Sequence, residues 1–440
     1  MKLFITLIIL FLFSNCSFDD KTGIWKNENV IKKDEEGPYR DFKNIFDSKI
    51  VFEKTINLDK SLVFNLSPVI KNNQWLDPFY SNSNNTLNYK YNNNFQLIFK
   101  SKKLTNYSPS KNILYQDKKV ILNDIGGNII VYSIKKKKII SKFNFYKKRY
   151  KGLQKKLNFL IHKKIIYVSD NLGYIYAFDY QFNSLLWAKN FNIPFKSNLK
   201  IYKNMIISAN HKNNIFFINK DNGEIIKSIP TEETNVTNQF VNNFSIKNSD
   251  LFFLNSFGSL YSIDLNLKRI NWFLNLNQSL DLTTNNLFNG NQIINFKNRI
   301  AVSSDKFSYL IDSQIGNILN NKNYLSNLNP IFNNEYIFLV TKNNFLVATN
   351  LDDGKILYSY NIKTQLSKFL NIRKKLKINN FFLVNNKIFI FLNNKYVALF
   401  NINGQIEEIN KLPSKIKTNP IFIDGSIIYL NNKNKIEIID

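Results

Sequence analysis

The sequence predicts an all-β protein built as an eight-bladed β-propeller, with four antiparallel strands in each blade. Three observations predict this fold. A strand motif recurs eight times, its copies are spaced by about 44 residues on average, and the last copy ends at the final residue of the chain. The length agrees, because 440 residues exceed one ordinary domain unless that domain is a closed array.

The recurring motif is an alternating apolar strand that ends in Asp, Asn or Ser. Residues 170–191, DNLGYIYAFDYQFNSLLWAKNF, contain a glycine turn, this strand, a polar bend and a further strand. The eight copies are NIIVYS ending at Ser133, YIYAFD at Asp179, NIFFIN at Asn219, SLYSID at Asp264, FSYLID at Asp312, FLVATN at Asn350, YVALFN at Asn401 and KIEIID at Asp440. Such a period, made of short strands, is typical of propeller blades.

Other strands flank each copy and complete the blade. Two apolar strands precede it, such as NFLIH and KKIIYVSD, and one follows it, such as SLLWAKNF. Tight turns are predicted at Asn222-Gly223, Asp353-Gly354 and Asn403-Gly404, because Asn and Gly tolerate a positive φ. Since the chain has only 13 glycines, we expect asparagine to supply further left-handed turn residues, at Asn213-Asn214, Asn343-Asn344 and Asn393-Asn394.

An aromatic residue recurs at one position of the fourth strand. Trp187 and Trp272 each fall eight residues after their aligned aspartate, and Tyr358 falls eight residues after Asn350. Large aromatic side chains at a repeated position favour core packing over ligand binding, so we expect each of them to face a neighbouring blade.

The last copy lacks a following strand, and the chain offers one elsewhere. Residues 94–104, NFQLIFKSKKL, lie before the first complete blade and have the pattern of a fourth strand. We predict that this N-terminal strand completes the last blade and closes the ring, which removes exposed sheet edges. The propeller then spans residues 94–440, and residues 16–93 form an extended tether with segments on its surface.

Residues 1–15 predict a lipoprotein signal peptide. One lysine precedes an apolar run from Leu3 to Phe13, which is too short to span a bilayer but suits a secretory signal. Cys16 is the only cysteine and lies where such a signal would end, so we predict that it carries the lipid. The alternative is an ordinary secreted protein with a chance cysteine. Either way, one cysteine excludes an intramolecular disulfide.

The net charge of +28 is unevenly distributed along the chain. Residues 100–164 hold 19 Lys or Arg against Asp117 and Asp124, which predicts a basic side of the molecule. In an exported protein, anionic lipid headgroups or an acidic protein face suit this charge, and nucleic acid does not. Compositional drift in a chain rich in Asn, Lys and Ile is the competing explanation.

No catalytic or metal motif is present in the sequence. The two histidines, His162 and His211, are isolated from each other and from the cysteine, so a zinc site or a nucleophilic site built on them is not expected. The glycine-rich loop of nucleotide-binding proteins and the nucleophile elbow of hydrolases are both missing. We therefore expect no enzyme activity and no cofactor.

These features together resemble the BamB family, which are propeller lipoproteins built of PQQ-like repeats. The resemblance covers about residues 48–440 and includes the segment around Trp75, SPVIKNNQWLDPFYSNSNNTLNY, before the blades. It implies a non-catalytic, monomeric scaffold on the periplasmic face of the outer membrane, where Ser17 after the lipidated cysteine suits outer-membrane sorting. The implied partners are the barrel subunit BamA and other members of the barrel assembly machinery.

In that family the partner contacts come from loops that join the middle blades. The matching loops here span residues 230–243 and 277–289. The candidate partner-binding residues are Asp281, Leu282, Glu232 and Glu233. Two alternatives stay open. One is an envelope-associated propeller that binds another anionic partner or surface. The other is a PQQ-dependent dehydrogenase, although the vicinal disulfide that such enzymes place over the quinone would need a second cysteine.

Overall fold

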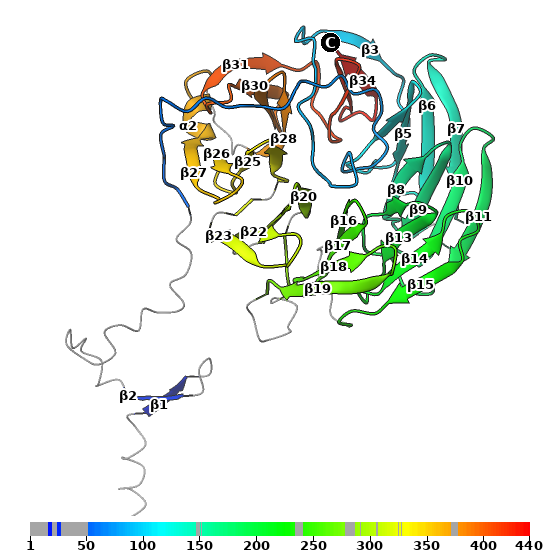
Figure 1. Cartoon of the computed structure of the whole chain (residues 1–440). Helices are drawn as coiled ribbons and strands as arrows, with labels where there is room; N and C mark the ends of the chain where they lie inside the picture. The colour runs from blue at the N-terminus through cyan, green and yellow to red at the C-terminus, as the bar shows by residue number, and fades with distance from the viewer. Residues whose placement is uncertain are drawn as a thin grey trace, which may run out of the picture. The chain divides into compact units, whose positions relative to one another are not determined.

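Eight four-stranded sheets stand around one axis in residues 97–440 (Figure 1). The structure is a computed structural model, and it describes residues 16–19, 24–27, 52–146, 150, 152–233, 241–277, 287–290, 292–304, 307–323, 325–326, 328–370 and 377–440. The chain divides into two compact units, residues 1–50 and residues 51–440. In the first unit, β1 (Cys16–Asp19) pairs antiparallel with β2 (Ile24–Asn27).

Each of the first four blades is an antiparallel meander whose first strand is innermost. Blade 1 contains β4 (Leu114–Gln116), β5 (Lys119–Asn123), β6 (Asn128–Ser133) and β7 (Lys138–Asn144). Blade 2 contains β8 (Leu157–His162), β9 (Ile165–Asp170), β10 (Tyr174–Asp179) and β11 (Ser184–Asn190). Blade 3 contains β12 (Lys200–Tyr202), β13 (Met205–Ala209), β14 (Ile215–Asn219) and β15 (Ile225–Ile229). Blade 4 contains β16 (Asn243–Lys247), β17 (Asp250–Leu254), β18 (Ser259–Asp264) and β19 (Arg269–Asn275).

The remaining blades follow the same order, except at the chain terminus. Blade 5 contains β20 (Ile294–Phe296), β21 (Arg299–Ser303), β22 (Ser308–Asp312) and β23 (Ile318–Lys322). Blade 6 contains β24 (Ile331–Asn333), β25 (Tyr336–Val340), β26 (Phe345–Asn350) and β27 (Ile356–Asn361), followed by α2 (Ile362–Leu366). Blade 7 contains β28 (Ile378–Val384), β29 (Lys387–Leu392), β30 (Tyr396–Phe400) and β31 (Ile406–Lys411). Blade 8 contains β32 (Ile421–Ile423), β33 (Ser426–Leu430), β34 (Ile436–Ile439) and β3 (Leu97–Lys100).

The N-terminal strand closes the ring, as predicted. β3 pairs antiparallel with β34, so that Leu97 lies opposite Ile439 and Lys100 lies opposite Glu437. Gln96 and Asp440 also exchange two backbone hydrogen bonds of 3.0 Å. Figure 1 shows these two strands, from opposite ends of the propeller, side by side. The eight-bladed fold with four antiparallel strands per blade is therefore confirmed.

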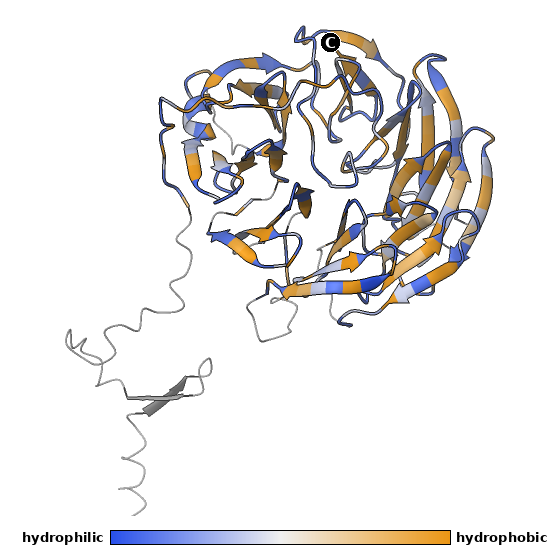
Figure 2. Cartoon of the chain, in the orientation of Figure 1, coloured by the Kyte–Doolittle hydropathy of each residue, from blue (hydrophilic) through white to orange (hydrophobic). Residues whose placement is uncertain are grey.

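Burial decreases from the middle strands of a blade to its outer strand. All residues of β6 and β13 are buried, because these strands are covered on both faces by the neighbouring blades. The outer strand β11 is mostly exposed. Figure 2 shows the same gradient, with continuous apolar colour on inner strands and mixed colour along the outer strand β19. A β-bulge separates the third and fourth strands of every blade and twists the outer strand, which makes its edge harder to extend.

Asparagine replaces glycine in several turns between the second and third strands. Gly127, Gly173 and Gly258 have a positive φ there, and Asn213 and Asn344 take the equivalent position with φ of 67° and 65°. The asparagine prediction is confirmed at these two sites. In blade 7 the left-handed residue is Lys395 rather than an asparagine of the 393–394 pair.

The repeated aromatic residue joins blades 2, 4 and 6 each to the following blade. Trp187 of blade 2 donates from Nε1 to the Lys220 carbonyl of blade 3 at 3.1 Å. It also covers Gly223, where an added Cβ would come within 2.6 Å of the indole ring. Trp272 covers Gly316 and Tyr358 covers Gly404 in the same way. The core-packing prediction is confirmed, and the glycines in the turns are required because a neighbouring aromatic ring fills the space of a side chain.

Candidate functional site

One segment, residues 70–92, contacts the innermost strand or its adjoining turn in every blade, and we call it the axial loop. Its hydrogen bonds follow the ring in chain order: Asn72 to blade 8, Trp75 to blade 1, Leu76 to blade 2, Asp77 to blade 3, Asn82 and Asn84 to blade 4, Ser83 and Asn84 to blade 5, Asn85 to blade 6, Tyr89 to blade 7 and Asn92 again to blade 8. Ile70 pairs with Tyr89 through a backbone bridge. The axial loop therefore makes one full circuit and meets its own beginning.

The axial loop supplies partners for a row of free strand edges. The innermost strand of a blade has N–H and C=O groups that face the axis, and each buried group needs a hydrogen bond. Trp75 and Tyr115 exchange two backbone hydrogen bonds of 2.8 Å. Where the loop crosses from blade 4 to blade 5, the Asn84 side chain donates to the carbonyls of Phe244 and Ile293, each at 2.8 Å. Here a side-chain amide, and not a backbone amide, donates to the strand edges.

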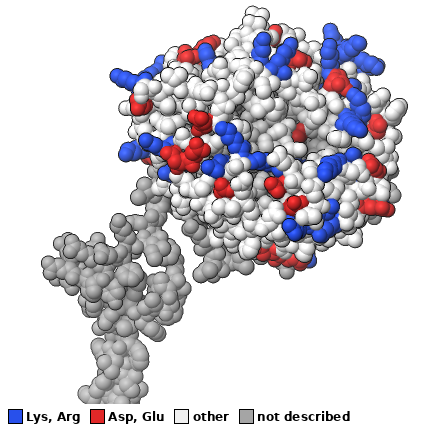
Figure 3. Space-filling model, in the orientation of Figure 1, with Lys and Arg blue, Asp and Glu red and all other residues white. Residues whose placement is uncertain are grey.

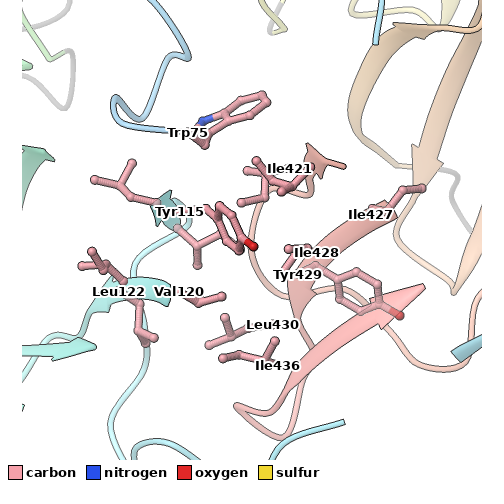
Figure 4. Close-up of a cluster of buried hydrophobic side chains, with 14 of the residues drawn as sticks. Trp75, Tyr115, Val120, Leu122, Ile421, Ile427, Ile428, Tyr429, Leu430 and Ile436 are labelled. Atoms are coloured by element: carbon pink, nitrogen blue, oxygen red, sulfur yellow. The ribbon is translucent and has the colours of Figure 1, made fainter. Parts of the chain in front are cut away.

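Aromatic side chains anchor the axial loop between blades 8 and 1. Trp75 is 4% exposed, and Figure 4 shows its ring near Tyr115 of blade 1 and Ile421 of blade 8. Tyr89 is fully buried and stacks on Phe422, with the ring centroids 5.5 Å apart. These contacts make the axial loop part of the largest hydrophobic core of the protein.

A buried ion pair fixes the axial loop to blade 3. The Lys200 side chain is fully buried, and its Nζ lies 2.8 Å from Asp77 Oδ2 and 2.7 Å from the Ser81 carbonyl. Burial lowers the pKa of Lys200, and the adjacent Asp77 carboxylate opposes that shift. Asp77 Oδ1 also accepts from the Phe79 backbone N–H at 2.8 Å. Two acceptors of the axial loop thus hold the buried Lys200 ammonium group.

The axis of the ring is occupied by the chain itself. Pro78, Phe79, Asn84 and Thr86 of the axial loop form part of the wall of a cavity of about 400 Å³. The rest of that wall comes from the segments that enter the innermost strands of blades 1, 5, 6, 7 and 8. The position where a closed ring most readily holds a small molecule therefore contains side chains of residues 70–92.

Of the four predicted partner-binding residues, Glu232 is exposed, and its carboxylate joins a polar cluster of blade 4. Its carboxylate accepts from Asn255 Nδ2 and Ser259 Oγ at 2.8 Å each, and from the Tyr261 hydroxyl. Burial raises the pKa of Glu232, but the hydrogen bonds from Tyr261, Ser259 and Asn255 outweigh it and hold that pKa below 4.5. Glu232 thus links the loop after blade 3 to blade 4.

Glu233 is exposed as well, but it bonds to blade 3 instead of blade 4. Its side chain is 55% exposed, accepts from Asn214 Nδ2 at 3.0 Å and lies 3.7 Å from Lys212 Nζ. The hydrogen bond from Asn214, followed by the charge of Lys212, lowers the pKa of Glu233. Asp281 and Leu282 lie outside the described residues. Both described candidates are exposed, and Glu233 is the less engaged in hydrogen bonds with the rest of the protein.

The other positions singled out from the sequence take ordinary structural places. Cys16 is in β1, where its backbone lies opposite Asn27. His162 and His211 lie on separate blades, and burial lowers the pKa of both. Among the described residues, no group of three or more His, Cys, Asp or Glu side chains is placed to hold a metal ion. No helix in the described part of the chain is long and apolar enough to cross a membrane.

The basic stretch of residues 100–164 contributes mainly to blade 1. Lys135, Lys136 and Lys137, in the turn between β6 and β7, are exposed. Figure 3 shows blue side chains gathered over the part of the molecule where Figure 1 places β6 and β7, with a few acidic side chains between them. This face is basic but not uniformly so.

Comparisons with known proteins identify the fold. No family model matches the chain, and no curated protein matches it. The solved structures that resemble it include BamB from Moraxella catarrhalis, with 13% identity, a TM-score of 0.59 and coverage of 77% of this chain and 99% of that chain. A quinohemoprotein alcohol dehydrogenase from Comamonas testosteroni has 9% identity, a TM-score of 0.61 and coverage of 83% and 80%. The designed protein Ika8 has 12% identity, a TM-score of 0.57 and coverage of 77% and 98%. At these identities the likeness shows the propeller alone.

Proposed function

We propose that this chain is a non-catalytic scaffold lipoprotein that assists the assembly and insertion of β-barrel proteins into the outer membrane. In this role it binds the periplasmic part of a BamA-like barrel subunit, together with other members of that machinery. Cys16 carries the lipid that anchors it to the periplasmic face of the outer membrane.

The observation that carries this proposal is the axial loop. An enzyme that holds its cofactor and substrate on the axis of a propeller needs that axis open, whereas residues 70–92 line the axis here and bond to all eight blades. The loops between blades are the surfaces that such a rigid scaffold presents to a partner.

Two further features agree with the proposed role. The sequence places an apolar signal before Cys16, which suits a lipid-anchored envelope protein. The likeness to BamB extends over 99% of that solved chain. Both features concern the architecture, so the partner itself has to be tested by binding.

The test is affinity capture from detergent-solubilised outer membranes, with the tagged full-length chain as bait. The wild type should capture a BamA-like subunit. The double variant Asp281→Ala/Leu282→Ala should capture at least about tenfold less, since contact residues at the centre of an interface often contribute more than 1.4 kcal/mol. The matched control, Glu335→Ala, removes an exposed acid from blade 6 and should capture as much as the wild type.

Two results would contradict the proposal. Capture of no barrel subunit by the wild type would remove the assembly role, and binding to anionic liposomes would then favour an envelope propeller with another anionic partner. Dye reduction with an alcohol, after addition of calcium and pyrroloquinoline quinone, would contradict the non-catalytic role.

The lipid anchor has its own test. Cys16→Ser should move the protein from the membrane fraction to the soluble periplasm, because no other cysteine can carry the lipid. Fractionation of the wild type and the variant measures this. Membrane retention of the variant would show that some other feature holds the protein there.

A further inference from the structure

A larger cavity lies beside the axial one, against blades 6, 7 and 8. Its volume is about 880 Å³, which is within the range of roughly 300–1,000 Å³ for ligand pockets. Its walls are the turn between β25 and β26, the start of β28, the end of β29 and the residues before β32. Lys111, just before blade 1, completes it. The two cavities share five wall residues, which are Lys111, Leu328, Asn379, Asn380 and Asn419.

Four lysines line this cavity, which we call the lysine cavity. They are Lys111, Lys342, Lys377 and Lys417, and no Asp or Glu is among the seventeen described residues of its wall. Each lysine comes from a different segment of the chain. The fold therefore brings these four lysines together, and no single lysine-rich stretch of the sequence supplies them.

Among the residues that the structure describes, these lysines have no acidic partner. None of the four forms an ion pair with another described residue, whereas Lys200 is paired with Asp77 and Lys212 with Glu233. Lys417 donates instead to the side-chain oxygen of Asn434 at 2.9 Å. Several like charges around one cavity repel each other, and an anion bound between them would remove that repulsion.

Neutral groups in the wall can complete an anion site. Asn380 donates to Asn419 at 2.7 Å, and Asn419 donates to Asn112 at 2.8 Å, which fixes these amides across three blades. The side-chain amides of Asn344, Asn379 and Asn393 have no hydrogen bond to another described residue and line the cavity. Apolar side chains of Val340, Phe391 and Ile416 form another part of the wall.

We propose that the lysine cavity binds an anion that carries a phosphate group and an apolar portion. Lysine ammonium groups bind phosphate as point charges, and free amides add hydrogen bonds to its oxygens. The apolar wall accommodates the rest of the ligand. A soluble phosphate ester and a phospholipid headgroup share this chemistry. The site lies on blades 6 to 8, apart from Glu232 and Glu233 on blades 3 and 4.

The test uses the full chain and two probes. Dodecyl phosphate, kept below its micellar concentration, represents a soluble ester, and phosphatidylcholine vesicles that contain phosphatidylglycerol represent a membrane. The variant Lys342→Gln/Lys377→Gln should weaken binding of the preferred probe at least about tenfold, as expected for the loss of charge-assisted hydrogen bonds. The control Lys135→Gln/Lys136→Gln removes the same charge from the turn between β6 and β7 and should change binding less than about twofold.

Each outcome decides the proposal. Lysine-dependent binding of dodecyl phosphate supports a soluble ester, and lysine-dependent binding of the vesicles alone supports a lipid headgroup. Equal weakening by both variants would overturn the site, because net charge would then explain binding. Absence of binding to either probe would also overturn it. Lys342, Lys377, Lys135 and Lys136 are all exposed, so neither double variant is expected to unfold. If Lys342→Gln/Lys377→Gln fails to fold, Lys111→Gln replaces it. Capture of the barrel subunit, measured on the same variants, should not change.

Discussion

The blades and the axial loop achieve burial in opposite ways. A blade buries its strands against copies of itself, so its sequence repeats the same apolar pattern eight times. The axial loop contacts eight similar surfaces with one segment that does not repeat, and it relies on Trp75, Tyr89 and a set of asparagines. Periodicity in the sequence therefore predicts the blades, which pack against similar blades. It does not predict the segment that lines the axis.

This difference between the blades and the axial loop should affect the stability of the protein. Loss of one contact in a blade affects one of eight similar interfaces, whereas the axial loop joins all innermost strands at once. We expect substitutions in the axial loop to cost more stability than matched substitutions in a blade. The predictions that follow test this expectation, from the largest effect to the smallest.

The largest effect is expected at Trp75. Trp75→Ala removes a side chain that is 4% exposed at the junction of blades 8 and 1, and it should lower the free energy of unfolding by about 3–5 kcal/mol. Trp272→Ala, at the half-buried blade position, should cost about 2 kcal/mol. Urea unfolding of both variants measures this. Equal losses would mean that the axial loop is no more important than one blade contact.

The next effect concerns the buried ion pair. Lys200→Met leaves the Asp77 carboxylate without its cation and should cost about 3 kcal/mol. The double variant Lys200→Met/Asp77→Asn removes both charges and should recover most of that loss. Lys203→Met, at an exposed lysine near the same strand, is the control and should change stability by less than about 0.5 kcal/mol. A double variant as unstable as the single one would show that packing rather than charge is lost.

A smaller effect is expected at the contact between neighbouring blades. Gly404 has a φ of 81°, and a Cβ there would come within 2.5 Å of the Tyr358 ring, so Gly404→Ala should cost about 2 kcal/mol. Gly152 has no heavy atom within 4 Å of its built Cβ, so Gly152→Ala should be neutral or slightly stabilising. Thermal unfolding distinguishes the two. A neutral Gly404→Ala would mean that Tyr358 moves away at no cost.

The blades could be predicted from the sequence because their physical signal is local. The alternation in NIIVYS and its copies marks a strand, and the glycine or asparagine turns mark its ends. The strand at residues 97–100 could be predicted because the last repeat has no fourth strand after it in the sequence. Residues 16–93 were expected to form a tether with surface segments, yet Trp75, Tyr89 and Tyr91 are buried at the axis.

The sequence did not predict this burial because an asparagine-rich run can be either a linker or a segment whose side chains bond to backbone groups. The run from Ser81 to Asn85 has the composition of a linker, but in the fold Asn84 and Asn85 hold backbone groups of three blades. The lysine cavity was equally hidden, because its lysines are far apart in the chain. Glu232 and Glu233 are adjacent in sequence, and only the structure shows that Glu232 bonds to blade 4 whereas Glu233 contacts Asn214 and Lys212 of blade 3.

The smallest effect is expected where β3 closes the ring, and it depends on pH. β3 closes blade 8 partly through Glu437, whose fully buried carboxylate lies 2.9 Å from Lys100 Nζ and 2.9 Å from the Tyr429 hydroxyl. Burial raises the pKa of Glu437, but hydrogen bonds from Ser414, Lys100 and other donors outweigh it and hold that pKa below 4.5.

Because the folded pKa is lowered, the stabilisation from Glu437 is present above pH 4.5 and is lost as pH falls through the folded pKa. Glu437→Gln should cost about 1 kcal/mol at neutral pH, and its difference from the wild type should shrink below pH 4.5. Glu408→Gln, at an exposed glutamate on β31 of blade 7, should show no such convergence. Urea unfolding across this pH range measures it. A constant difference between Glu437→Gln and the wild type would mean that shape, not charge, is what Glu437 contributes, and that the terminal strand is held chiefly by its backbone pairing with β34.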